Sequence, residues 1–200
     1  MQYSISMTRL AEGEPLYPED PDLPLVTAMA QGDAEALEEL YRRRGPRLLA
    51  YLSARLGNPG LAEEVLQDVM LAAWQGAARF RGAGRAWAWL LAIARNRAIN
   101  AYHRQVQPDS VVESEADMDA GQLEMPGEPI ELDEGGQQGQ ALQQALSGLP
   151  AAQRETLELV FFQGLSLEET AQVMGVAEGT IKSRLHRARA RLRGRMKDEG

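Results

Sequence analysis

Apolar residues recur at helical spacing from about Leu25 onward, and no stretch shows the alternation typical of a strand. The spacing predicts helices over about 34–41, 46–56, 61–78 and 85–103, bounded by caps, glycines or prolines. Helical periodicity returns at about residue 140 and persists to 195. The sequence therefore predicts an all-α fold with two small helical domains.

The segments between these helices predict the domain boundaries. Residues 1–22 hold three prolines among acids and have no sustained period, so we expect a flexible N-terminal tail. Residues 106–139 are acidic, contain prolines and glycines, and lack a helical apolar stripe, so we expect a flexible linker. The first domain is thus expected over 23–105 and the second over 140–200.

Charge is unevenly distributed, although the net charge of −8 by itself argues against nucleic-acid binding. Residues 69–108 carry six arginines and no acid, and residues 109–140 carry ten acids and no base. Residues 182–197 carry eight lysines and arginines and no acid. Two basic surfaces, each suited to a polyanion, are therefore separated by an acidic spacer.

The C-terminal domain contains the pattern of a helix-turn-helix. Ser166 and Glu169 have the spacing of a capping box, and Gly175 can make the sharp turn before a second helix that starts near residue 177. That second helix is apolar on one face and basic on the other, a form that suits the major groove. The alternative is a hairpin with a solvated basic face. Structural helices usually mix charge signs, which disfavours this alternative.

The third predicted helix carries a candidate protein-binding surface. Its core face is apolar, and Leu71 lies nearly opposite that face, beside the polar residues Glu64, Gln67 and Asp68. An exposed leucine among carboxylates is consistent with a docking site, although single exposed leucines are also common.

Arginines alternate with aromatic residues, without acids, between residues 79 and 104. Unpaired nucleotides require this combination, because the charges bind the backbone and the flat rings stack on bases. The alternative is that both tryptophans are core residues. We expect Trp89 to be a core residue and regard Phe80 and Trp87 as better candidates for base contact.

The sequence lacks the residues and motifs that several classes of function require. There is no cysteine, only two histidines, no phosphate loop and no cluster of metal ligands, so we expect no enzyme, no cofactor and no metal. The longest apolar run is far shorter than the about 20 residues of a membrane helix, and a signal-peptide pattern is lacking. We therefore expect a cytoplasmic protein without membrane insertion.

Two blocks of sequence together resemble the extracytoplasmic-function sigma factors of bacteria. The first comprises LAEEVLQDVMLAAW at 61–74 and RFRGAGRAWAWLLAIARN at 79–96, and the second is GLSLEETAQVMGVAEGTIKSRLHRARAR at 164–191. The resemblance covers about 25–105 and 140–195. The two blocks, taken together and in this order, are highly specific to the family. The chain departs from the usual pattern at 85–87, where a serine, a phenylalanine and a basic residue are commoner, and at Ala92.

The resemblance implies partners and roles for the residues above. The family binds core RNA polymerase and helps to open a promoter, so Glu64, Gln67, Asp68 and Leu71 would dock on the clamp of the beta-prime subunit. The second domain would meet the flap of the beta subunit. The minus-ten contacts would come from Arg79, Phe80, Arg81, Trp87, Arg95, Asn96, Arg97 and Asn100. The upstream, minus-thirty-five element would be read by Thr180, Lys182, Ser183, Arg184, His186, Arg187 and Arg189. An anti-sigma factor is a further implied partner, although no residue here identifies one.

The spacing of promoter elements explains why such a chain would need a polymerase. Elements roughly 20–25 base pairs apart are separated by about 70–85 Å. A flexible linker of about 35 residues spans only about 30–35 Å on average. Stretching the linker to span both elements costs conformational entropy, and a large partner that holds both domains would offset that cost. The acidic linker could occupy a channel built for RNA, or it could have no such role.

The main competing interpretation is a transcriptional regulator that reads an operator with its helix-turn-helix and senses a signal or dimerises with its first domain. It accounts for the C-terminal motif but leaves the acid-free block of arginines and aromatics unexplained. Co-purification with core polymerase distinguishes the two.

Overall fold

The computed structural model describes residues 20–80, 82, 84–106 and 146–198, and every element in these ranges is helical. The predicted linker at 106–139 and the predicted tail at 1–22 lie almost entirely outside the described residues. The first group of helices is α1 (Leu23–Ala30), α2 (Ala34–Leu56), α3 (Pro59–Gly76), the short 3-10 helix η2 (Ala77–Arg79) and α4 (Ala86–Val106). The second group is α6 (Ala151–Leu157), the π-helical turn η3 (Glu158–Phe162), α7 (Leu167–Met174) and α8 (Glu178–Asp198).

Helix α2 is continuous, and the predicted break before Pro46 is therefore wrong. A proline inside a helix removes one hydrogen bond and costs about 3 kcal/mol. Here Pro46 is exposed, while Leu40, Leu48 and Leu52 lie on one fully buried face of the helix. Burial of each such leucine contributes about 1.5–3 kcal/mol, so the continuous apolar face outweighs the proline.

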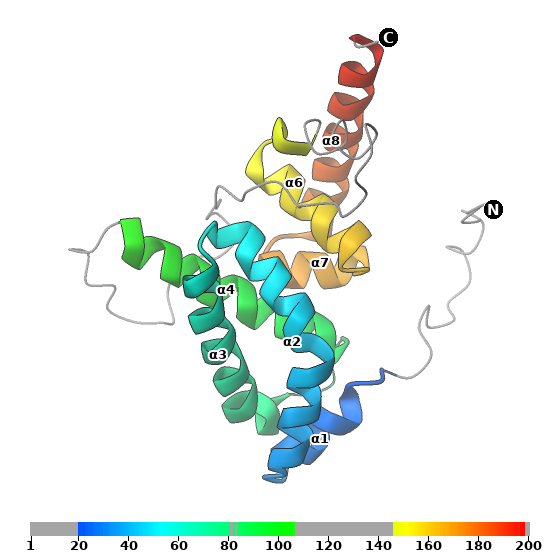
Figure 1. The fold of residues 1–200 in the computed structure, drawn as a ribbon. Coiled ribbons are helices and arrows are strands. Elements are labelled where there is room, and N and C mark those ends of the chain that lie inside the picture. The colour runs from blue at the N-terminus through cyan, green and yellow to red at the C-terminus, as the bar shows by residue number, and fades with distance from the viewer. Residues whose placement is uncertain (1–19, 81, 83, 107–145, 199–200) are drawn as a thin grey trace, which may run out of the picture.

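A side-chain cap lies at the start of each of α2 and α3. The Asp33 carboxylate accepts hydrogen bonds from the backbone N–H groups of Glu35 and Ala36 at the start of α2. Asn58 does the same for Leu61 in α3. The predicted apolar face of α3 is confirmed, because all of its members are buried: Ala62, Val65, Leu66, Val69, Met70 and Ala73. Helices α1–α4 enclose this core (Figure 1).

The predicted helix-turn-helix is confirmed. Ser166 and Glu169 form the reciprocal capping box, and Gly175 takes a left-handed conformation with φ of 64°, which an L side chain rarely adopts. Helix α8 then buries one face in the core of the second domain, through Ile181, Leu185 and Ala188.

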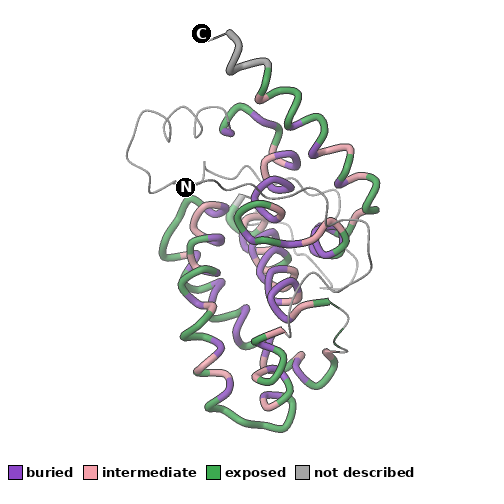
Figure 2. Tube along the Cα trace, turned by 90° about the vertical axis from the view of Figure 1, so that its right-hand side faces the viewer, coloured by how far each residue is buried: buried purple, intermediate pink, exposed green. Residues whose placement is uncertain are grey.

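The two groups of helices pack against each other. Figure 1 shows α7 beside α4, and α6 above the bundle, while α8 projects away from it. The buried stretches of the tube in Figure 2 follow the faces where neighbouring helices meet. In this closed arrangement, which we define by the contact of α7 with α4, the second domain covers one side of the helix predicted to bind the minus-ten element. The sequence had indicated two tethered domains without this contact.

Within the described ranges, no helix has the length and apolar character to cross a membrane. The same ranges contain no group of three or more acidic, histidine or cysteine side chains placed to hold a metal ion.

Candidate nucleic-acid interface

An aromatic pair forms the centre of the acid-free surface predicted between residues 79 and 104. The rings of Phe80 and Trp89 lie with centroids 5.0 Å apart at an interplanar angle of 34°. Phe80 follows η2 and Trp89 lies in the first turn of α4, so the loop between them brings the two rings together. Gly82, within that loop, has a φ of 67°, a left-handed conformation that favours glycine.

The pair borders a cavity of about 390 Å³ between α3 and α4. Its other walls combine cationic and amide side chains, and none of the described residues that line it is acidic. The lining comprises Ala72, Gly76, Arg79, Phe80, Trp89, Ile93, Asn96, Arg97 and Asn100. Stacking faces, amide groups and guanidinium groups in one hollow can bind a planar base and an adjacent phosphate.

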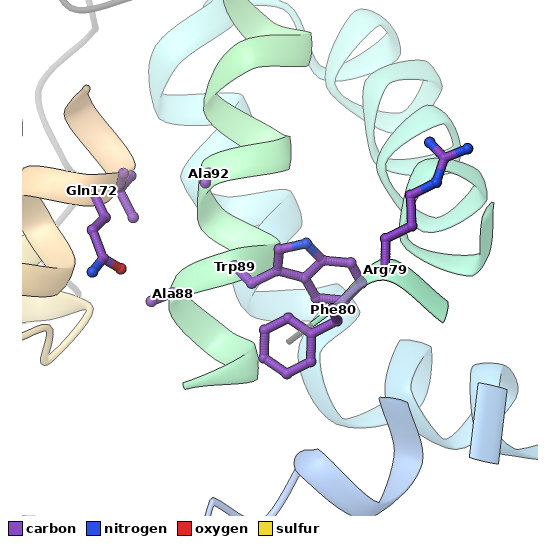
Figure 3. Close-up of a pocket in the computed structure, with 7 residues that line it drawn as sticks. Arg79, Phe80, Ala88, Trp89, Ala92 and Gln172 are labelled. Atoms are coloured by element: carbon purple, nitrogen blue, oxygen red, sulfur yellow. The ribbon is translucent and has the colours of Figure 1, made fainter. Parts of the chain in front are cut away.

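A second cavity, of about 280 Å³, is also lined by the same aromatic pair. Figure 3 shows Phe80 and Trp89 beside Ala88 and Ala92, with Gln172 facing them from α7. This cavity is therefore bounded by both domains, whereas the larger one is formed by the first domain alone.

Trp87 lies on a different side of α4 from Trp89. It is only 3% exposed, and its indole Nε1–H donates to the Gln163 carbonyl of the second domain at 3.2 Å. The guanidinium groups of Arg44 and Arg47 lie 5.1 and 5.0 Å from the centroid of its ring. The expected order of exposure of the two tryptophans is therefore wrong, because the second domain covers Trp87 and leaves Trp89 lining the cavities.

Some of the other predicted minus-ten residues are accessible in the closed arrangement, and one is covered by the second domain. Arg79 and Asn96 are exposed, and Arg97 and Asn100 are half-buried in the wall of the larger cavity. Arg95 is 2% exposed and donates from Nε to Glu155 in the second domain at 2.9 Å. Arg81 lies outside the described residues.

Helix α8 presents the predicted upstream-element residues along one side. Lys182, His186, Arg187 and Arg189 are exposed, and Thr180, Ser183 and Arg184 are half-buried. Arg187 donates to the Ser183 hydroxyl at 2.7 Å, and Lys182 pairs with Glu178 one turn earlier at 2.7 Å. Both members of that ion pair are well exposed, and such pairs contribute only about 0–1 kcal/mol. A phosphate or a base edge can therefore displace Glu178 at little cost.

Sequence reasoning missed the exposed aromatic residues of η3. Phe161 is 56% exposed and lies 5.7 Å from the Arg189 guanidinium, and Phe162 is 38% exposed. The run LVFF at 159–162 could have indicated them, because four consecutive apolar residues cannot all lie on one buried face of a helix.

The candidate polymerase-binding surface lies on α3. Glu64, Gln67 and Asp68 are exposed, and Leu71 is 54% exposed. The structure thus places all four on the side of α3 that faces away from the core, as the periodicity predicts.

Charged side chains join the two domains in the closed arrangement. Arg55 of α2 lies 3.1 Å from Glu155 and 3.0 Å from Glu158, and Arg95 also binds Glu155. We call these four residues the buried charge cluster, since each of the side chains is less than a tenth exposed. Burial raises the pKa of the Glu158 carboxyl, and Arg55 opposes that rise.

A second ionic contact lies near the start of α7. Arg85 donates from Nε and Nη2 to the two carboxylate oxygens of Glu169 at 2.7 and 2.8 Å, and from Nη2 to the Gly164 carbonyl at 2.7 Å. Burial acts to raise the pKa of Glu169, but hydrogen bonds from Arg85 and Ser166 outweigh it and hold the pKa below its usual value.

Comparison with known proteins identifies the two halves. The family model "Sigma-70 region 2" matches residues 40–107, and "Sigma-70, region 4" matches residues 139–192. The chain is 37% identical over 177 residues to the ECF RNA polymerase sigma factor SigM of Mycobacterium tuberculosis (strain ATCC 25618 / H37Rv), covering 86% of this chain and 82% of SigM. It is 34% identical over 165 residues to the ECF RNA polymerase sigma factor RpoE of Cereibacter sphaeroides, covering 82% and 88%.

Solved structures agree with this assignment. The sigma factor RpoE of Bartonella quintana, in complex with the anti-sigma factor NepR, has a TM-score of 0.58 and 30% identity over 82% of this chain and 98% of that one. CnrH, in complex with the cytosolic domain of CnrY, shares the fold at a TM-score of 0.60 and 23% identity, covering 90% and 99%. The chain therefore belongs to the extracytoplasmic-function sigma factors of the sigma-70 family and is an RNA polymerase sigma factor that acts in promoter recognition.

Proposed function

We propose that three surfaces of this chain divide the work of a sigma factor. The outer side of α3 around Leu71 docks on core RNA polymerase, and the cavity beside Phe80 and Trp89 captures a base of the minus-ten element. The basic side of α8 reads the minus-thirty-five element in the major groove. The proposed place of action is the bacterial cytoplasm, and an anti-sigma factor is a further proposed partner, by analogy with the complex of RpoE and NepR.

The observation that carries the proposal is the acid-free cavity with its tilted aromatic pair. Its volume of about 390 Å³ lies within the range of about 300–1,000 Å³ typical of ligand sites. An extruded base can stack on Trp89, hydrogen-bond to Asn96 or Asn100, and leave its phosphate near Arg79 or Arg97. Stacking of this kind contributes about 1–3 kcal/mol per base, enough to hold a base that has already left the duplex.

The helix-turn-helix supplies the upstream contact by a separate mechanism. Lys182 and Arg187 are exposed on α8 and can reach base edges, while Arg189 and half-buried Thr180 can contact phosphates. Because the phosphate contacts are ionic, the affinity of the free chain for DNA should fall steeply with salt. We expect the free chain to bind duplex DNA weakly. Core polymerase provides specificity by holding both domains on one promoter.

Replacement of Phe80 tests base capture. Promoter DNA with 2-aminopurine in the nontemplate strand of the minus-ten element would be mixed with core enzyme and either the natural chain or Phe80→Ala. The natural chain should raise the fluorescence as the strand opens, and Phe80→Ala should lower that signal about tenfold while retention of closed promoter complexes persists. Tyr41→Ala is the matched control, since Tyr41 is an aromatic residue 49% exposed on α2, away from the cavity. Equal opening by all three proteins would contradict the assigned base site.

A further inference from the structure

An exposed phenylalanine lies beside the basic helix of the second domain. Phe161 belongs to η3, the π-helical turn that follows α6, and the Arg189 guanidinium of α8 lies over its ring, 5.7 Å from the centroid. Phe161 is 56% exposed, and Arg189 is exposed as well. Single π-helical turns are frequent at functional sites. The fold therefore places an aromatic face and a cation together at the surface of the helix-turn-helix domain.

The position of Arg189 on α8 suits a phosphate contact. The residue lies about three helical turns after the start of α8, and it follows directly after Ala188 of the buried face. The first residues of a recognition helix contact base edges, whereas the later turns and the flanks of the helix meet the sugar-phosphate backbone. Arg189 is therefore placed for the backbone of the upstream element rather than for its bases.

The aromatic ring holds Arg189 without using its hydrogen-bond donors. Among the residues that the structure describes, Arg189 has no carboxylate partner, and Phe161 is the group that contacts its guanidinium. Lys182 on the same helix instead pairs with Glu178. A guanidinium group can stack on a ring through its face and still present its N–H edge to a phosphate. The contact with Phe161 thus leaves Arg189 able to bind DNA.

Holding an exposed arginine in advance of binding has a physical benefit. Its long side chain loses rotamer freedom when it is fixed on a phosphate, and this loss lowers the affinity. A ring that already restricts the guanidinium reduces the loss, because part of the ordering takes place on folding. Phe161 can therefore strengthen DNA binding through Arg189 without a base contact of its own.

We propose that Phe161 is a positioning residue of the upstream interface, whose ring holds the Arg189 guanidinium in place for a phosphate of the minus-thirty-five DNA. The proposal rests on the function proposed above for α8. Charge favours DNA as the neighbour of this ring, since residues 182–197 carry eight lysines and arginines and no acid. The alternative occupant is an apolar surface of core polymerase, which predicts that loss of the ring weakens binding to core enzyme.

The proposal has two quantitative consequences. A cation–π contact at an exposed site changes an equilibrium constant about two- to fivefold, so loss of the ring should weaken DNA binding by that factor. Because the ring acts through Arg189, the factor should vanish once Arg189 is replaced. Loss of the Arg189 phosphate contact itself should lower the slope of log affinity against log salt by about 0.9.

Four substitutions separate the ring from the rest of the side chain. Phe161→Leu keeps an apolar side chain but removes the ring, and Phe161→Tyr restores the ring. Phe162→Ala is the matched control, because Phe162 is the adjacent aromatic residue, is 38% exposed, and has no ring contact with Arg189 in the described chain. Arg189→Gln removes the charge on which the ring acts.

The assay measures the affinity of the holoenzyme, assembled from core polymerase and the full chain, for a labelled duplex that carries the upstream element. Fluorescence anisotropy over a series of salt concentrations gives both affinity and slope. Phe161→Leu should bind about two- to fivefold more weakly with a reduced slope, whereas Phe161→Tyr and Phe162→Ala should match the natural chain. In the Arg189→Gln chain, Phe161→Leu should cause no further loss. Circular dichroism checks that each variant keeps its helices.

The outcomes separate the role of Phe161 from the proposed function. Affinity and slope of Phe161→Leu equal to those of the natural chain, or the same loss with and without Arg189, would overturn the positioning role and leave the function of α8 standing. Weaker binding of Phe161→Leu to core polymerase would assign the ring to a polymerase contact and overturn the proposal as well. If the natural holoenzyme binds a duplex with a scrambled upstream element equally well, the function proposed for α8 is wrong.

Discussion

Glu155 gives the sharpest quantitative test of the contact between the domains. Its carboxylate lies 3.1 Å from Arg55 and 2.9 Å from Arg95, and all three side chains are almost completely buried. Glu155→Gln changes the buried charge cluster from two cations and two anions to two cations and one anion. Removal of one partner from a buried ion pair costs about 3–5 kcal/mol, and the amide oxygen retains one acceptor, so about 3 kcal/mol is expected.

That cost falls on the closed arrangement alone. In an open chain Glu155 would face water, where a glutamine is equally well solvated. A difference of about 3 kcal/mol changes the ratio of closed to open chains about 150-fold. The helices of each domain should keep their stability, because the substituted side chain serves the contact between the domains rather than either core.

The assay combines energy transfer with a urea titration. Since the chain has no cysteine, Ala50→Cys and Ala190→Cys allow a donor and an acceptor dye to be placed on exposed sites of α2 and α8. Glu155→Gln should lower energy transfer in the free chain and should split one unfolding transition into two. Glu38→Gln is the control, since Glu38 is exposed on α2 and lies outside the cluster. Unchanged transfer and a single transition at the natural midpoint would refute the reasoning that closure depends on these charges.

Three further predictions concern the other surfaces. Leu71→Glu should weaken binding to core polymerase about tenfold, because a side chain 54% exposed can bury its remaining surface on a partner, while the melting temperature moves little; a large fall in melting temperature would instead place Leu71 in the core. Reversal of charge at Lys182 and Arg187 should abolish footprints on the upstream element and leave polymerase binding unchanged, and loss of both would indicate misfolding. Acid should weaken the contact of Arg85 with Glu169, because the lowered pKa of Glu169 means that this pairing is complete above the usual glutamate pKa of about 4.3 and is lost as the pH falls through the lowered value; energy transfer in the natural chain that stays unchanged from neutral pH to a pH below that lowered value would contradict this.

Local signals in the sequence predicted most of the helices and the helix-turn-helix. The capping box at Ser166, the left-handed Gly175 and the apolar face of α8 depend on neighbours within about one helical turn. The break expected before Pro46 failed because a proline is a local signal, whereas the leucines that keep α2 continuous act through the core.

The contact between the domains was beyond such signals. Arg95 and Glu155 are separated by 60 residues in the chain, and Arg85 and Glu169 by 84. Helical periodicity gives the side of a helix that is apolar, but it does not give the partner of a polar side. Trp87 was therefore expected to be open to bases, and Trp89, which lines the cavities, was expected to be in the core.

Run-off transcription with purified core RNA polymerase on genomic fragments tests the central claim most directly. The natural chain should yield transcripts with discrete start sites, each preceded by two shared sequence elements spaced roughly 20–25 base pairs apart. Core enzyme alone, or core enzyme with the charge reversals in α8, should yield none of them. An absence of specific transcripts from every fragment, despite active core enzyme and a folded chain, would contradict the account.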